Sequence, residues 1–274
     1  MMRNKTAYIP YNNDLKLVKK IKDLNLEKNN IQVIFYFSPS PSLIGTGRRC
    51  PNFEKFVDKG EFSENLFEES LNEFLILCKN FGFGTNLLLN NVLLGLPFSN
   101  QDLVEKIPKI QKFLENLDKK DLISMITIGN PYLIELLNLE KLSNIKVKTS
   151  VNFQIKNHKS IDILNNLVKY YFPANLYEIE LQKDLLRDIP SLKKIKKTLK
   201  SNIKLSILVN EGCLTGCPYQ QAHQIHSCSF PTKELSKYDK EFNFGIARCK
   251  YIVASEPWRF IDSNWILPEQ LVHY

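Results

Sequence analysis

The sequence predicts an α/β fold in the form of a (β/α) TIM-type barrel, with room for irregularity at its C-terminal end. Short apolar strands alternate with amphipathic helices along the chain, which is typical of a parallel sheet covered by helices. Seven or eight such units fit within 274 residues, as a barrel requires. An open doubly wound sheet is the alternative. It expects a GxGxxG fingerprint after an early strand, and the chain has ten glycines and no such motif.

The spacing of apolar residues predicts the individual elements. Residues 14–24 place leucine, valine and isoleucine at helical intervals, and 32–37 is a β-branched and aromatic run of the kind found in strands. Pro131 suits the first turn of a helix, and Pro190 predicts a kink or junction. The expected strands are 6–9, 32–37, 85–89, 122–128, 146–151, 176–181, 203–209 and a candidate eighth at 251–254. The expected helices are 14–24, 66–80, 102–117, 132–139, 160–170 and 184–199, with 268–274 as the start of a last one.

The composition indicates a soluble globular protein, which we expect to form one barrel domain over residues 1–274. Apolar residues make up 43% of the chain and charged residues 24%, both ordinary values. The first residues show no signal-peptide pattern, and no apolar run approaches 18 residues, so we expect no membrane insertion. A cytoplasmic, reducing location follows as an expectation. In such a compartment clustered cysteines bind metals or do redox chemistry more often than they form disulfides.

The net charge of +8 is compatible with a nucleic-acid partner. The lysines are dispersed, however, and the densest run, at 193–197, has no arginine or aromatic residue interleaved with it. We therefore interpret that run as the solvated face of an amphipathic helix in preference to an RNA site.

Short polar side chains follow most of the predicted strands. Because function gathers at the carboxyl ends of barrel strands, these side chains are candidates for binding a small ligand or orienting a cofactor. The alternative is that asparagine simply terminates strands well. The residues concerned are Asn12, Asn13, Arg48, Asn90, Asn130, Asn152, Gln154, Asn210 and Glu211.

The segment 207–228 contains three of the six cysteines and two of the four histidines. Cys213 and Cys217 are four residues apart, so one helical turn would place both sulfurs on one face. Cys228 and Cys249 complete a set of four thiols, within a cysteine-rich segment at 210–250. Four thiolates are the usual ligands of a 4Fe-4S cluster and also of a structural zinc ion.

The spacing separates the alternatives for these cysteines. Zinc fingers and ribbons use CxxC or His-x3-5-His pairs, which the segment does not offer, so we prefer a 4Fe-4S cluster. The CxxxCxxC pattern of radical-SAM enzymes is also absent. A catalytic Cys–His pair, with His223 or His226 as the base, stays open but leaves the other thiols unexplained. Cys78 lies among apolar residues of a predicted helix and is expected in the core.

Several segments resemble the collagenase-like (U-thirty-two type) peptidase family. The stretch VNEGCLTGCPYQQAH is similar to the family signature, and four further segments resemble segments of that family. They are GTGR at 45–48, GNPYLIELL at 129–137, KVKTSVNFQ at 146–154 and the closing SNWILPEQLVHY.

The resemblance implies a barrel protein with a 4Fe-4S cluster on four cysteines, matched here by Cys213, Cys217, Cys228 and Cys249. In some members one ligand follows the second strand, where this chain has Cys50. Better understood relatives act in oxygen-independent hydroxylation of ubiquinone precursors or RNA bases, with prephenate as the implied oxygen donor. The implied partners are a small-molecule or RNA substrate and a homologous partner subunit.

Two further residues are candidates for a role in such a reaction. Arg48 could bind an anionic group of the substrate, and Glu211 could act as acid or base near the cluster. The chain departs from the family in its GRRC loop, where many relatives have a proline, and in the short spacing of the close cysteine pair. A peptide hydrolase, as the family name suggests, and a non-catalytic RNA- or protein-binding module are the alternatives.

Overall fold

The computed structural model describes residues 5–40, 43, 53–58, 61–90, 100–171, 176–199, 202–209, 217, 220, 251–252, 254–263, 266–267 and 269–270. Within them, seven parallel strands form one curved sheet, in the order β1-β2-β5-β6-β7-β8-β9. The strands are β1 (Lys5–Pro10), β2 (Ile31–Phe37), β5 (Gly84–Leu89), β6 (Met125–Ile128), β7 (Lys146–Thr149), β8 (Leu176–Glu180) and β9 (Lys204–Ser206).

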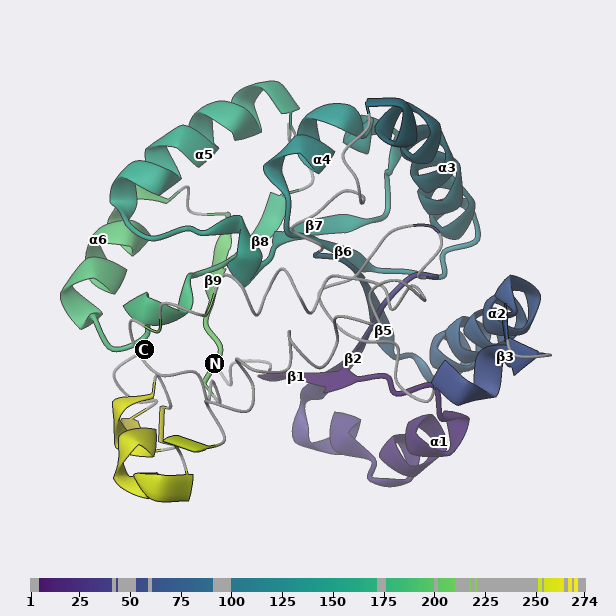
Figure 1. Ribbon diagram of the computed structural model, residues 1–274, viewed down its shortest axis with the longest axis horizontal. Helices are drawn as coiled ribbons and strands as arrows, with labels where there is room; N and C mark the ends of the chain where they lie inside the picture. Colours follow the sequence, from purple (N-terminus) through teal and green to yellow (C-terminus); the bar gives the residue numbers. More distant parts are fainter. Residues whose placement is uncertain are drawn as a thin grey trace.

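Helices cover the outer, convex side of this sheet and leave the strands around a common interior, as in a TIM-type barrel (Figure 1). Each strand pairs with the next one of the sheet in chain order, so the predicted α/β fold is confirmed. The helices are α1 (Leu15–Asp23), α2 (Glu64–Phe81), α3 (Asn100–Lys119), α4 (Pro131–Leu136), α5 (His158–Tyr171) and α6 (Ile189–Thr198). None of these helices is both long and apolar enough to cross a membrane.

Short elements connect these strands and helices. They are the 3-10 helices η1 (Leu26–Asn29), η2 (Phe53–Phe56), η3 (Leu139–Lys141), η4 (Val151–Phe153), η5 (Lys183–Leu185) and η6 (Pro257–Asp262), and a hairpin of β3 (Val57–Asp58) and β4 (Glu61–Phe62). The hairpin has only two residues in each strand, too few for a periodic pattern, so the sequence did not predict it.

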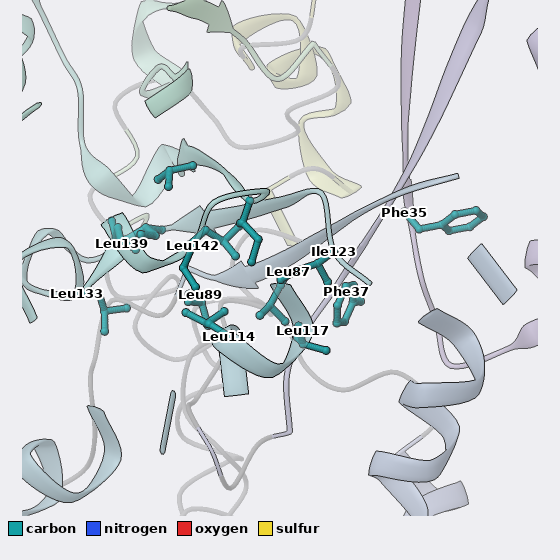
Figure 2. Packing of buried hydrophobic residues seen from close by; sticks show 14 of the residues in the cluster. Phe35, Phe37, Leu87, Leu89, Leu114, Leu117, Ile123, Leu133, Leu139 and Leu142 are labelled. Atoms are coloured by element: carbon teal, nitrogen blue, oxygen red, sulfur yellow. The ribbon is translucent and has the colours of Figure 1, made fainter. Parts of the chain in front are cut away.

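The main hydrophobic core lies between the sheet and its helices. Alternate strand residues point outward into it, because side chains alternate between the two faces of a strand. Figure 2 shows Leu87 and Leu89 of β5 beside Leu114 and Leu117 of α3, and all four are buried. The strand residues between the outward-pointing ones face the opposite side of the sheet and line the interior of the barrel.

Local signals explain where the helices begin. The side chains of Asp14, Ser63, Asn130 and Asp188 each accept a hydrogen bond from a backbone N–H of the helix that follows. Proline occupies the first turn of α4 and α6. The lysines at 193–197 are exposed while Ile195 between them is fully buried, so the predicted solvated face of α6 is confirmed.

The structure corrects three sequence predictions. The candidate eighth strand at 251–254 is wrong, because the described residues there are helical. Helix 184–199 is divided, and α6 begins at Ile189 beside Pro190, which removes a backbone donor and so favours a helix start over a helix interior. Strand 146–151 ends at Thr149 because the Ser150 hydroxyl accepts from Asn152 N and starts η4. The predicted last helix at 268–274 is described only at 269–270.

Candidate functional site

The described residues define two polar regions of the sheet, one at its carboxyl-terminal edge and one in its interior. At the edge, Asn12 and Asn13 follow β1, Asn90 follows β5, Asn130 follows β6, and Asn152 with Gln154 follows β7. Because all these strands are parallel, the amides lie at the same end of the sheet. For the described residues, the predicted position of the amides at the carboxyl ends of the strands is therefore confirmed.

Several of these amides order the loops of the mouth. The Asn130 side chain accepts a hydrogen bond from Tyr132 N at 2.9 Å and starts α4. The Asn152 side chain donates to the backbone carbonyl of Asn90 at 2.9 Å. A Cβ on Gly129 would lie 2.6 Å from that same carbonyl oxygen, so only glycine allows this approach. These contacts favour the structural interpretation for Asn130 and Asn152.

Cys217 is the one proposed cluster ligand among the described residues. It follows the β9 segment, its thiol is free and partly exposed, and its carbonyl oxygen accepts from Gln220 N at 3.1 Å, which closes a turn. The other site residues predicted from sequence lie outside the described residues: Arg48, Cys50, Glu211, Cys213, Cys228 and Cys249, as do Asn210, His223 and His226. Among the described residues alone, no three metal-ligating side chains cluster.

Cys78 is not a ligand candidate. It is fully buried on α2, and burial raises the pKa of its thiol to about 12. The core role expected from the sequence is confirmed.

The second polar region is an ionic cluster inside the sheet, and it was not predicted. Lys148 Nζ lies 2.7 Å from Glu178 Oε1 and 3.6 Å from Glu180 Oε2. The Tyr8 hydroxyl donates to Glu178 Oε2 at 3.1 Å, and Lys148 also lies over the Tyr8 ring, 4.8 Å from its centroid. Lys148, Glu178 and Glu180 are all at least nine-tenths buried, so three charged groups from β7 and β8 share a space with little water.

Burial dominates the electrostatics of this cluster. It raises the pKa of Glu180, against the opposing attraction of Lys148. It also raises the pKa of Tyr8, and the neighbouring Glu178 carboxylate raises it further. When all three groups are ionised, one lysine and two carboxylates give the cluster a net charge of −1. The cluster can therefore take up a proton on Glu180.

A signal for this cluster was present in the sequence. Lys148, Glu178 and Glu180 alternate with apolar residues in segments that otherwise read as strands. In a parallel sheet whose outer face is covered by helices, charges at every second position must point into the interior.

The free, partly exposed thiol of Cys217 suits a soft metal. Thiolates bind iron–sulfur clusters and zinc, whereas carboxylates and carbonyls suit magnesium and calcium. Cys217 is thus compatible with the thiol set that the sequence predicts.

Comparison with known proteins supports the resemblance seen in the sequence. No family model matches the chain. The uncharacterized protease MJ1657 of Methanocaldococcus jannaschii is 23% identical over 269 residues, which cover 94% of this chain and 68% of that protein. Among solved structures, the U32 peptidase Mk0906 superposes with a TM-score of 0.56 at 13% identity, covering 82% of this chain and 76% of the other. The likeness to Mk0906 shows a shared fold. Together with the motifs and the likeness to the M. jannaschii protease, it supports the resemblance to the collagenase-like, U32-type peptidase family.

Proposed function

We propose that this protein carries a 4Fe-4S cluster and acts in oxygen-independent hydroxylation of a small molecule or an RNA base. Cys213, Cys217, Cys228 and Cys249 are the proposed ligands, with Cys50 in reserve. The observation that carries the proposal is Cys217, a free and partly exposed thiol just beyond the β9 segment. The mouth of a barrel is where such folds do their chemistry.

The chain offers the donor set that the cluster requires. Six cysteines are present, Cys78 is committed to the core, and five remain for four places. A cluster bound there would supply one-electron redox chemistry. Arg48 is proposed to bind an anionic substrate group through its planar guanidinium, and Glu211 to move a proton. Such chemistry suits a reducing compartment, so we propose a cytoplasmic location, and the protein acts alone or with a homologous partner subunit.

The candidate eighth strand bears on Cys249. A strand at 251–254 would begin just after this residue and would put it at the end of the barrel opposite Cys213. Residues 251–252 and 254–255 are helical, so that predicted strand does not exist and no longer assigns Cys249 to the far end.

Iron and sulfide analysis of anaerobically purified protein tests the proposal. We expect about four irons per chain and a broad visible absorbance that fades in air. Cys213→Ala, Cys217→Ala, Cys228→Ala and Cys249→Ala should each lose iron, and Cys50→Ala shows whether the reserve residue replaces one of them. Cys78→Ala is the matched control, since it removes a thiol from the core and should keep the iron.

Two outcomes would overturn the proposal. One is a colourless protein without iron. The other is iron that survives all five substitutions outside the core. Cleavage of a peptide substrate by the iron-free protein would then favour the hydrolase that the name of the M. jannaschii relative suggests.

A further inference from the structure

A small cavity opens toward the amino-terminal end of the sheet. Its volume is about 190 Å³, and its lining comes from six strands, β1, β2, β6, β7, β8 and β9, and from Ser124, just before β6. This volume is equal to that of about six water molecules, so it can hold only a small ligand. The residues that matter for its chemistry are Lys146, Tyr177, Glu178, Lys204 and Ser206.

Two lysines face one aromatic ring in this cavity. Lys146 Nζ lies 4.4 Å from the centroid of the Tyr177 ring and Lys204 Nζ lies 4.5 Å from it. Lys204 Nζ also donates to the Tyr177 hydroxyl. Neither lysine has a carboxylate within ion-pair distance among the described residues. Two like charges therefore converge on one ring with no described acidic partner, an arrangement that a bound anion would stabilise.

The inner wall of the cavity offers a polar group that is not yet satisfied. Ser206 Oγ is buried and meets no hydrogen-bond partner among the described residues. Buried hydroxyls without a partner are rare, because losing water costs free energy that a partner normally restores. Ser206 could donate to a ligand oxygen between the lysines.

The charge balance of the cavity favours an anion. Glu178 is the acidic residue of the lining, and its carboxylate is already engaged by Lys148 and by the Tyr8 hydroxyl. Lys146 and Lys204, here called the rim lysines, therefore leave a net positive charge at the opening. An ammonium group binds an oxyanion as a point charge with three donors.

We propose that this cavity is a binding site for a small oxyanion, either a phosphate group or a compact dicarboxylate, held by Lys146, Lys204 and Ser206. None of its lining residues is a proposed cluster ligand, so the proposal does not depend on the cluster. A nucleic-acid strand does not fit the space, so the +8 charge of the chain is not the basis of the proposal.

Calorimetric titration with inorganic phosphate, and separately with malonate, tests the proposal on the full chain as isolated anaerobically. We expect saturable binding of at least one anion at one site per chain. Lys146→Met and Lys204→Met should each raise the Kd about tenfold, as expected for losing a hydrogen bond to a charged group, and Ser206→Ala should raise it a few-fold. Tighter binding of phosphate would point to a phosphate ester as the natural ligand, and tighter binding of malonate to a dicarboxylate.

Lys193→Met is the matched control, because it removes the same charge from an exposed position on α6 and should leave the Kd unchanged. All three lysines are exposed, so the variants should fold, and equal thermal midpoints confirm it. The proposal is overturned if neither anion shows saturable binding, or if both rim variants bind as the wild type does. Equal weakening by Lys193→Met would also overturn it, since the binding would then follow net charge alone.

Discussion

Replacing Lys148 with methionine should strongly destabilise the protein. Methionine keeps the length of the side chain and removes the charge that Glu178 faces at 2.7 Å. At an effective dielectric constant of about 20, a pair at that distance is worth about 6 kcal/mol. Part of this is offset, because a buried lysine no longer has to be desolvated. Removing one partner of a buried pair typically costs about 3–5 kcal/mol, and we expect a loss of about 4 kcal/mol here.

The groups that remain around Glu178 cannot replace the charge of Lys148. In Lys148→Met, Glu178 would keep the Tyr8 hydroxyl at 3.1 Å as its hydrogen-bond donor and would face Glu180 with no cation between them. Urea unfolding followed by far-UV circular dichroism measures the change in the free energy of unfolding. In a thermal scan the same loss would lower the midpoint by about 10 °C.

Two controls make the test specific. Lys22 and Glu27 form a pair at the same 2.7 Å distance, but their side chains are 35% and 49% exposed, whereas those of Lys148 and Glu178 are 8% and 7% exposed. Lys22→Met should therefore cost no more than about 1 kcal/mol. The double variant Lys148→Met with Glu178→Leu should recover most of the lost stability, because no buried charge is left alone. The reasoning is refuted if Lys148→Met costs no more than Lys22→Met, or if the double variant recovers nothing.

Three further predictions concern single side chains. Burial raises the folded-state pKa of Glu180, so its contribution to stability is present below the unfolded pKa and is lost as pH rises through the folded one. Glu180→Gln should therefore gain stability relative to wild type as pH rises from 4 toward 7, and a difference that shrinks with pH would contradict this. Gly129→Ala should cost about 1–3 kcal/mol, because the new methyl group would meet the Asn90 backbone at 2.6 Å. The same change at Gly82, which has open space but φ +72°, should cost about 1 kcal/mol, and equal losses would refute the clash. Cys78 should react with a thiol reagent only in urea, because burial raises its pKa to about 12, and labelling in the native state would count against a core position.

Most of the fold was predictable because its signals are local. The periodicity of residues 14–24 and the β-branched run at 32–37 depend on neighbours a few positions apart, and both elements formed within one or two residues of their predicted bounds. The eighth strand failed for the same reason, since a run of four apolar residues at 251–254 fits a strand or a helix equally well. Asn130 was predicted at a strand end, and its capping of α4 shows why asparagine is common there.

The sequence by itself determined the alternation of strands and helices, the thiol-rich segment and the family resemblance, because each depends on residues close together in the chain. Only the tertiary structure decided that Tyr8 of β1 meets Glu178 of β8, 170 positions away, and that Lys148 lies between two buried carboxylates. Only the pairing of β7 and β9 with β8 brings Lys146 and Lys204 to the same tyrosine ring. Residue spacing reveals which face of a strand a charge occupies. It does not reveal which distant strand that face will meet, because that depends on how the whole sheet bends.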